Sequence, residues 1–325
     1  MKIPRPYLFE VLIASNLAVI ALVSPALILG TLPGQILGVM QYSIPCVVVG
    51  VGLRLAAGWR RRKARRLLTV FLSAKWLIDS VRLQIGLAAL THTYGWIKLL
   101  VPVLHHRLYD RELFQIDQAI FGGISPSVFL LTVFSSPPFL RFIDFTYAGV
   151  FVASLMIAST YFLSAPRARL RIAYMTSNTL LWLAGAWLYV LVPTLGPAYR
   201  FPKVWFEFAD HLVTTQGLQG LLMRNYRNVL RLAEGARAPV SIYCGIAAFP
   251  SLHVAYQALV AFWARREWIY GQIVFGVLAF FILIGSMITG WHYFVDGVAG
   301  IALAFGAYRV GSRVLGVRRI RASAP

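Results

Sequence analysis

The sequence predicts an all-α, polytopic membrane protein, and three observations support this class. Of the 325 residues, 59% are hydrophobic and 13% are charged, whereas a soluble domain is usually about half apolar and a quarter charged. The mean hydropathy is +0.70. Mostly apolar stretches long enough to cross a bilayer as a helix recur along the chain. We therefore expect about eight transmembrane helices, together with amphipathic helices at the membrane interface.

Windows of about 20 residues, the length that crosses the hydrocarbon core, locate these spans. They fall at 7–29, 36–57, 67–90, 140–163, 172–193, 250–265, 270–289 and 292–309. Prolines lie in or beside the connecting loops, where they end helices. The first span lacks a short apolar region followed by a small-residue cleavage site, so we expect a retained helix and not a signal peptide.

The basic residues predict the orientation of the chain. They gather at the N-terminus (Lys2, Arg5), in WRRRKARR after the second span, around 167–171, in ARREW after the sixth span, and in the tail. These five segments alternate along the spans and hold 18 of the 31 basic residues. Because basic loops stay on the cytoplasmic side, both termini are expected to be cytoplasmic.

Four regions follow from this topology. Residues 1–90 form three N-terminal transmembrane helices, and 91–139 form an interfacial amphipathic segment on the non-cytoplasmic side. Residues 140–308 form the catalytic transmembrane core, which contains the extracytoplasmic loop 194–249, and 309–325 form a basic cytoplasmic tail. The segment 91–139 is judged too polar to span because it contains six charged side chains, and a turn is expected at 120–126.

The net charge of +20 does not indicate a nucleic-acid partner, because the basic residues lie in short loops between apolar spans, where they set topology and meet anionic headgroups. Cys46 lies in a span and Cys244 in a long loop, so no disulfide is expected between them.

Two histidines and an aspartate stand at the mouths of apolar helices. His253 begins the sixth span and His292 the eighth, with 38 residues between them. Because two spans return the chain to its starting face, both histidines are expected at one depth on the non-cytoplasmic side. Asp296 follows His292 by four residues, on the same helix face. A carboxylate at this position accepts the imidazole Nδ1–H. The pairing lowers the cost of burying the carboxylate.

Three chemistries are weighed for this set. A serine hydrolase built on Ser251 lacks the G-x-S-x-G motif. A zinc site of His211, His253, His292 and Asp296 lacks closely spaced ligands. Phosphoryl transfer through histidine fits best, with one imidazole attacking phosphorus and the other protonating the leaving oxygen. The start of the sixth helix, near Pro250, is expected to present free N–H groups to a phosphate.

The segments AFPSLHV (248–254) and TGWHYFVD (289–296) resemble the second and third signature motifs of the type-2 phosphatidic acid phosphatase superfamily. More narrowly, they resemble the branch that contains inositol phosphorylceramide synthase. VPTLGPAYR (192–200) and DQAIFGGISP (117–126) are similar to further segments of that branch. The resemblance covers about residues 110–308.

The resemblance implies a six-helix bundle whose site lies at the non-cytoplasmic face. It implies that His292 is the nucleophile, Asp296 its orienter, and His253 the general acid and then the general base. It implies no metal and no organic cofactor.

The sequence departs from the superfamily at two points. The arginine six residues before the nucleophile is replaced by Ser286, and the first motif has no match. Arg200, Lys203 and Arg237 are therefore the candidate phosphate-binding cations, although each also suits solvent or lipid headgroups. Ser251 either binds phosphate or caps its helix. Tyr293, like Trp291, either contacts substrate or belongs to an interfacial aromatic belt.

Lys75, Asp79 and Arg82 share one face of the third span, where an internal salt-bridge ladder is expected, or else a polar cavity or headgroup site.

Three functions remain open. The first is a lipid phosphotransferase that moves an inositol-phosphate-like headgroup or a phosphoryl group from a lipid donor to an alcohol. The second is a phosphatase acting on a polyprenyl (di)phosphate or phosphatidate, with water as acceptor. The third is a transporter or accessory protein. The expected partners are membrane lipids and no nucleic acid, in a bacterial inner membrane.

Overall fold

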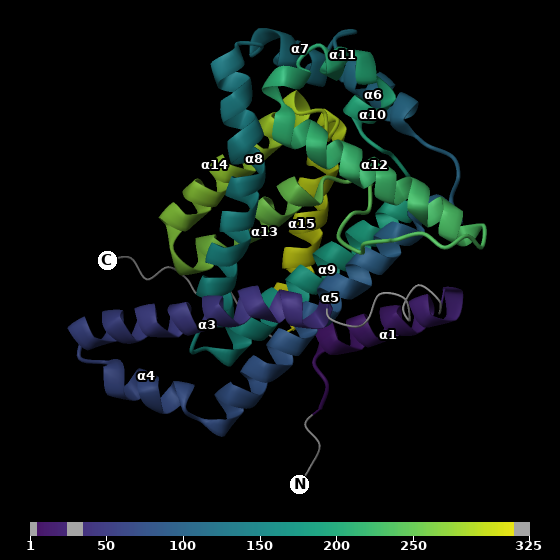
Figure 1. Ribbon diagram of the computed structural model, residues 1–325. Coiled ribbons are helices and arrows are strands. Elements are labelled where there is room, and N and C mark those ends of the chain that lie inside the picture. Colours follow the sequence, from purple (N-terminus) through teal and green to yellow (C-terminus); the bar gives the residue numbers. More distant parts are fainter. Residues whose placement is uncertain (1–4, 25–34, 315–325) are drawn as a thin grey trace. The chain divides into compact units, whose positions relative to one another are not determined.

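The computed structural model describes residues 5–24 and 35–314, and every regular element in that part of the chain is a helix (Figure 1). This confirms the all-α class. Expectations that concern residues 1–4, 25–34 and 315–325, including the end of the first span and the last arginines of the tail, fall outside the described residues.

The α-helices are α1 (Leu8–Val23), α3 (Gln35–Arg60), α4 (Ala64–Phe71), α5 (Ala74–Leu104), α6 (Asp110–Ile120), α7 (Pro126–Val133), α8 (Pro137–Ala158), α9 (Ala168–Leu191), α10 (Pro197–Arg200), α11 (Pro202–Phe206), α12 (Val213–Ala233), α13 (Leu252–Glu267), α14 (Ile269–Ile288) and α15 (Phe294–Val314).

Among the described residues, five helical segments are long and apolar enough to cross a membrane. They are Gly38–Arg60, Ala74–Leu104, Pro137–Leu163, Ile269–Ile288 and Phe294–Arg313. The other predicted spans coincide with α1, α9 and α13. The 16-residue α13 is short for a lipid-facing span, but it is buried along most of its length, so other helices and not lipid cover it.

The third predicted span, 67–90, is wrong in its boundaries. The chain forms α4, breaks after Phe71, and then forms α5, which continues to Leu104. The residues from 91 to 104 are therefore helical and largely buried, and do not belong to an interfacial segment. The charge of Lys98 misled the prediction, because a lysine inside an apolar helix is tolerated where the protein supplies partners.

The remainder of the segment 91–139 forms two short helices, α6 and α7. They are joined at Gly122 and Gly123, both with positive φ (63° and 92°), a conformation that glycine adopts without steric cost. The turn expected at 120–126 is confirmed.

The chain divides into two compact units, each assembled from separated segments. Within the described residues, unit 1 comprises the chain up to Thr93, Val152–Leu180, and the residues from Ala307. Unit 2 comprises Tyr94–Phe151 and Leu181–Gly306. All the predicted catalytic residues belong to unit 2.

Unit 1 contains a network of charges between α1 and α5. Arg82 forms an ion pair with Glu10, its Nε lying 2.7 Å from Oε1. Asp79, only 3% exposed, accepts a 2.7 Å hydrogen bond from the hydroxyl of Tyr7. The expected ladder within α5 is therefore wrong: Asp79 and Arg82 bond to α1, and Lys75 is exposed.

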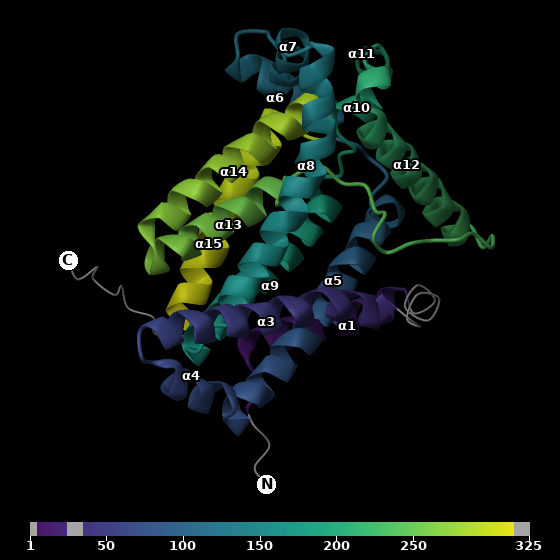
Figure 2. The ribbon, with the colours of Figure 1, turned by 60° about the vertical axis from the view of Figure 1, so that its left-hand side comes forward.

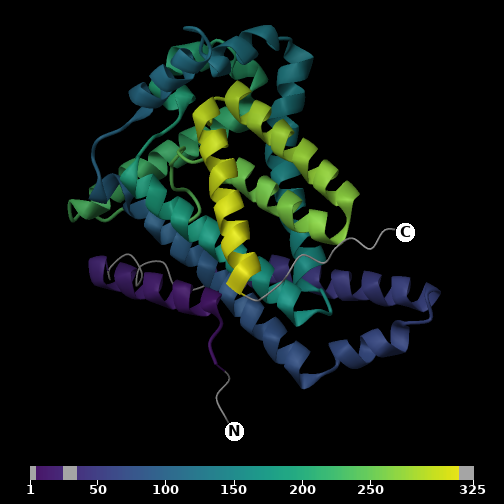
Figure 3. The ribbon, with the colours of Figure 1, turned by 180° about the vertical axis from the view of Figure 1, so that it is seen from behind.

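In unit 2, α13 packs along α14, and α15 crosses the start of α13 (Figures 2 and 3). The approach of α15 to the start of α13 is very close, since a Cβ at Gly300 would lie 2.4 Å from the carbonyl oxygen of Ser251. Gly185 of α9 similarly leaves room for Leu252. Glycines at these crossings bring the two catalytic motifs together.

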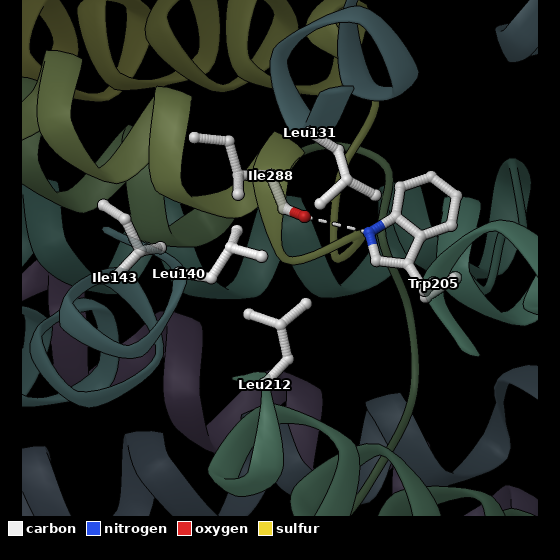
Figure 4. Close-up of a cluster of buried hydrophobic side chains, with 7 residues drawn as sticks. Leu131, Leu140, Ile143, Trp205, Leu212 and Ile288 are labelled. Carbon is white, nitrogen blue, oxygen red and sulfur yellow. Dashed lines mark hydrogen bonds between the residues drawn. The ribbon is translucent and has the colours of Figure 1, made fainter. Parts of the chain in front are cut away.

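A hydrophobic cluster supports the end of α14 (Figure 4). Its buried members are Leu131, Leu140, Ile143, Ala198, Trp205, Leu212 and Ile288. The indole Nε1 of Trp205 donates a 2.9 Å hydrogen bond to the carbonyl of Ile288, the last residue of α14. The cluster therefore fixes the point from which the chain turns toward His292.

Candidate active site

The turn between α14 and α15 positions His292. It begins at Gly290, whose φ of +74° and close contact with Trp205 and Ala198 suit only glycine. His292 lies in this turn, two residues before α15 begins, and not on the helix as expected. Asp296 lies in the first turn of α15 and is fully buried.

His292 and Asp296 are in contact, as their spacing predicted. The Nδ1 atom of His292 lies 3.3 Å from Oδ2 of Asp296, so a hydrogen on Nδ1 is donated to the carboxylate. The same oxygen accepts the backbone N–H of Tyr293 at 2.9 Å. The carbonyl of Ala248 also hydrogen-bonds the ring of His292. The Ala248 carbonyl favours the charged imidazole, but burial and the charge of Lys98 outweigh it and lower the pKa of His292 to about 3.

His253 faces His292 across the gap between α13 and the turn. The two imidazole centroids lie 5.8 Å apart, with the rings inclined at 64°. The backbone N–H of Ser251 donates to the carbonyl of Asp296 at 2.9 Å, so the start of α13 is tied directly to α15. The structure thus brings together all three predicted catalytic residues.

Aromatic rings of α8 line the other side of His253. The ring of Phe151 meets the imidazole edge to face at 4.3 Å, and the ring of Tyr147 lies at 5.9 Å. The Tyr147 hydroxyl is buried and has no hydrogen-bond partner among the described residues. Sequence reasoning missed both residues, because an aromatic side chain in an apolar helix gives no sign of what it faces.

Lys98 of α5 is a cation at this site that sequence reasoning assigned elsewhere. Its ammonium lies over the rings of Tyr189 (5.4 Å) and Tyr94 (5.8 Å), at distances where cation–π attraction operates. Its charge acts on both imidazoles, those of His253 and His292. The sequence did contain a signal for this role of Lys98. An isolated lysine within an apolar stretch suggests a functional site.

Two carboxylates of α6 hold the loops around the site. Asp110 accepts hydrogen bonds from the backbone of Leu195 and Gly196, the latter at 2.8 Å. Both lie in the segment VPTLGPAYR (192–200), the proline-rich loop. Asp110 also accepts the hydroxyl of Tyr293 at 3.1 Å. Burial raises the pKa of Asp110, while these donors and the charge of Arg200 oppose the rise.

Asp117 caps the N-terminus of α15. It accepts the N–H groups of Phe294 (2.7 Å) and Val295 (3.0 Å), which have no partner within the helix. Burial is the main cause that raises the pKa of Asp117 to about 6, with a contribution from the nearby charge of Asp296. The segment around α6 thus supports the catalytic turn directly, a role that only the fold reveals.

Two of the predicted substrate-binding residues are buried and make structural contacts. Tyr293 is fully buried and bonds to Asp110. The Ser251 oxygen is also buried and accepts the N–H of Val254 at 3.4 Å, so it caps α13. The N–H groups of Ser251, Leu252 and Val254 are all hydrogen-bonded, to the Asp296 carbonyl, the Tyr189 hydroxyl and the Ser251 hydroxyl, respectively.

The predicted cations lie on the surface. Arg200, Lys203 and Arg237 are all exposed. Of these, Arg200 is near enough for its charge to act on Asp110 and Tyr293. Ser286, at the position of the superfamily arginine, is buried and donates to the carbonyl of Leu283. In the described part of the chain, no three His, Cys, Asp or Glu side chains are grouped to hold a metal ion.

Comparison with known proteins supports the same region. Neither the curated proteins nor the solved structures gave a match. A family model described as the PAP2 superfamily matches residues 111–310, which include both histidine motifs and Asp296. Since this match covers more than half of the chain, the protein belongs to the PAP2 superfamily, whose members are phosphatases or phosphotransferases that act on phosphate esters.

Proposed function

We propose that this protein is an integral membrane phosphotransferase that moves a phosphorylated headgroup, of the inositol-phosphate type, from a lipid donor to an alcohol acceptor. The proposal rests on the pair of imidazoles 5.8 Å apart, one of them hydrogen-bonded to a buried carboxylate. Such a pair supplies a nucleophile on one side of a phosphorus atom and an acid–base group on the other.

In the first half-reaction, Nε2 of His292 attacks phosphorus and the bond from phosphorus to the donor's alcohol oxygen breaks. His253, protonated, gives its proton to that leaving oxygen. A phosphohistidine remains on His292, with its ring charge stabilised by Asp296. In the second half-reaction, His253 removes the proton of the incoming alcohol, the new oxygen–phosphorus bond forms, and the nitrogen–phosphorus bond breaks.

Lys98 is the best-placed cation for the phosphate oxygens, because its charge already acts on both imidazoles. It would do the work of the superfamily arginine that Ser286 replaces. Arg200, exposed beside the proline-rich loop, is the candidate for the outer, solvent-facing part of the headgroup. Arginine presents several donors in a fixed geometry and suits phosphate and polyol oxygens.

The surroundings of His253 favour an alcohol that belongs to a lipid. The rings of Phe151 and Tyr147 form an apolar wall next to the imidazole that deprotonates the acceptor. Apolar surface beside the reacting hydroxyl stabilises a hydrocarbon chain. The second candidate, a phosphatase acting on a polyprenyl (di)phosphate or phosphatidate, draws on the unpartnered hydroxyl of Tyr147, which offers a hydrogen bond to an attacking water.

The charge pattern of the loops gives the proposed setting. Both termini would lie in the cytoplasm and the site at the opposite face of a bacterial inner membrane. The outer leaflet would then supply donor and acceptor lipids.

The deciding experiment uses the purified full-length protein in vesicles with a radiolabelled phospholipid donor, with and without a long-chain alcohol. A new lipid that forms only with the alcohol supports transfer, whereas release of water-soluble phosphate or headgroup without it indicates hydrolysis. His292→Ala should abolish both reactions. It should also abolish the acid-labile labelling of the protein that a phosphohistidine intermediate would give. Asp296→Asn should lower kcat by about 10²–10⁴, as loss of a histidine-orienting carboxylate does elsewhere. Full activity of the His292 and His253 alanine variants would exclude this mechanism.

A further inference from the structure

The helix α12 packs one side against the rest of unit 2 and leaves the other side exposed. Its buried residues are Thr215, Gln219, Asn225 and Val229. Its outward face carries Leu218 and Leu221, which are 41% and 43% exposed. Large apolar side chains are therefore part of the exposed side of α12.

Arginines continue the outward face. Arg224, Arg227 and Arg231 follow Leu221 at intervals of three or four residues, and all three are exposed. At 3.6 residues per turn the three arginines share one side of the helix, and Leu218 and Leu221 lie beside that side on the same exposed half. In the described part of the chain no carboxylate forms an ion pair with any of them, and only Glu234 adds a negative charge to the end of the helix. Figure 2 shows α12 at the edge of unit 2, away from α13, α14 and α15.

The buried face of α12 contacts the segment TGWHYFVD (289–296) and the loop that precedes AFPSLHV (248–254). Gln219 donates a 3.0 Å hydrogen bond to the carbonyl of Thr289, three residues before His292. Asn225 donates to the carbonyls of Ser241 and Cys244 and accepts the N–H of Ser241, in the loop that leads to His253. At the other end, Asp144 of α8 accepts the N–H groups of Thr214 and Thr215. These polar groups of α12 are thus bonded within the protein, whereas its leucines and arginines at 218, 221, 224, 227 and 231 are exposed.

We infer that the outward face of α12 binds anionic phospholipid of the bilayer leaflet next to the active site. Leu218 and Leu221 would enter the acyl region, and the three arginines would contact phosphate groups. An apolar strip followed by basic residues is the pattern of helices that lie in an anionic membrane surface. The lipid-binding surface stands independently of the reaction. Its kinetic consequence rests on the proposed function, since an anionic donor lipid would be concentrated beside the site.

Lipid binding is tested on the purified full-length protein by native mass spectrometry in micelles containing phosphatidylglycerol and phosphatidylcholine. Wild type should retain phosphatidylglycerol preferentially, and added salt should weaken the retention. The triple variant R224Q/R227Q/R231Q should bind this lipid about 100-fold more weakly, at roughly fivefold for each arginine. The lysine triple, which keeps the charge, should retain most of the binding. Equal retention by wild type and the glutamine triple, or retention that salt does not change, would overturn the inference. If this face instead binds a protein partner, wild type should show no preference for anionic lipid, and the glutamine triple should retain the lipid equally.

The kinetic arm uses the same variants. The glutamine triple should raise the KM for an anionic donor at least several-fold while leaving kcat nearly unchanged, because no arginine of α12 contacts the reacting groups. The variant R61Q/R65Q/R66Q removes the same charge from exposed positions in unit 1 and should leave this KM unchanged. If wild type has no transferase or phosphatase activity, the proposed function fails while the lipid-binding result still decides the inference. If the glutamine triple unfolds, the salt dependence of wild type decides it.

Discussion

The hydroxyl of Tyr293 donates a 3.1 Å hydrogen bond to Asp110, a residue 183 positions earlier in the chain. The backbone N–H of the same tyrosine donates to Asp296, the carboxylate that contacts His292. Tyr293 therefore connects a carboxylate of α6 to the catalytic pair. It is a positioning residue, because its side chain is buried and has no exposed surface for substrate.

Tyr293→Phe should consequently lower kcat by about tenfold and leave KM for the donor nearly unchanged. Loss of one hydrogen bond to a charged group costs about 1.5–3 kcal/mol. We expect part of this cost to raise the activation free energy, because His292 is then held less well in position. Steady-state kinetics on reconstituted protein measure the split between kcat and KM. Tyr270→Phe, at an exposed position, is the matched control. A change in KM alone would indicate that Tyr293 contacts substrate after all.

Lys98→Met should raise KM and lower kcat together, for a loss in kcat/KM of about 10²–10³, because a phosphate-binding cation acts in both the bound complex and the transition state. Lys98→Arg should recover part of this loss. Lys75→Met removes the same charge from an exposed position of the same helix and should have normal kinetics. Normal kinetics of Lys98→Met would assign phosphate binding to another cation.

Asp117 should make the stability of the protein depend on pH. Its pKa in the folded protein, about 6, lies above its ordinary value of 3.8. The folded state therefore holds the proton more tightly than the unfolded chain, and this contribution to stability is complete below pH 3.8 and is lost as the pH rises through 6.

The measurement is the melting temperature of wild type and Asp117→Asn in detergent across that pH range. The difference, wild type minus variant, should fall as the pH rises. Asparagine keeps one acceptor for the N–H groups of α15, so the variant should fold. A difference that stays constant across the range would show that Asp117 does not titrate there.

The pair formed by Arg82 and Glu10 should stabilise unit 1. Arg82→Met removes the cation that faces the partly exposed Glu10, and unfolding should become easier by about 1–2 kcal/mol. The double variant Arg82→Met/Glu10→Gln removes both charges and should recover part of the loss, with a coupling energy of about 1–3 kcal/mol. Denaturant titration of the four proteins in the cycle gives this energy. Strictly additive effects would mean that the two side chains act separately in the membrane.

That His253, His292 and Asp296 lie together was predictable from sequence, because their relation along the chain is local or nearly so. Asp296 follows His292 by four residues, and two spans separate His292 from His253, so helix geometry alone brings them to one place. Lys98, Asp110 and Asp117 act, by charge or by hydrogen bonds, on residues about 85 to 195 positions away. No periodicity in a single chain reports such contacts.

Errors in helix boundaries had a related origin. Lys98 made its segment too polar to count as a span, although the fold surrounds its ammonium with the rings of Tyr94 and Tyr189. Hydropathy averages residues along the chain, whereas the cost of a charge depends on the groups around it. Sequence alone likewise could not show whether Asp79 and Arg82 bond to each other within α5 or to residues of another helix. The structure shows that they bond to Tyr7 and Glu10, at the start of α1.

The family match begins at residue 111, one position after Asp110 and well after Lys98. A protein trimmed to the matched region would keep every residue of the two histidine motifs yet lose the cation of the site and the carboxylate that holds the proline-rich loop. The group of residues around the two histidines is thus wider than the region that the family model matches. Transplanting the histidine motifs into another helical scaffold should fail for the same reason, unless the end of α5 and the start of α6 travel with them.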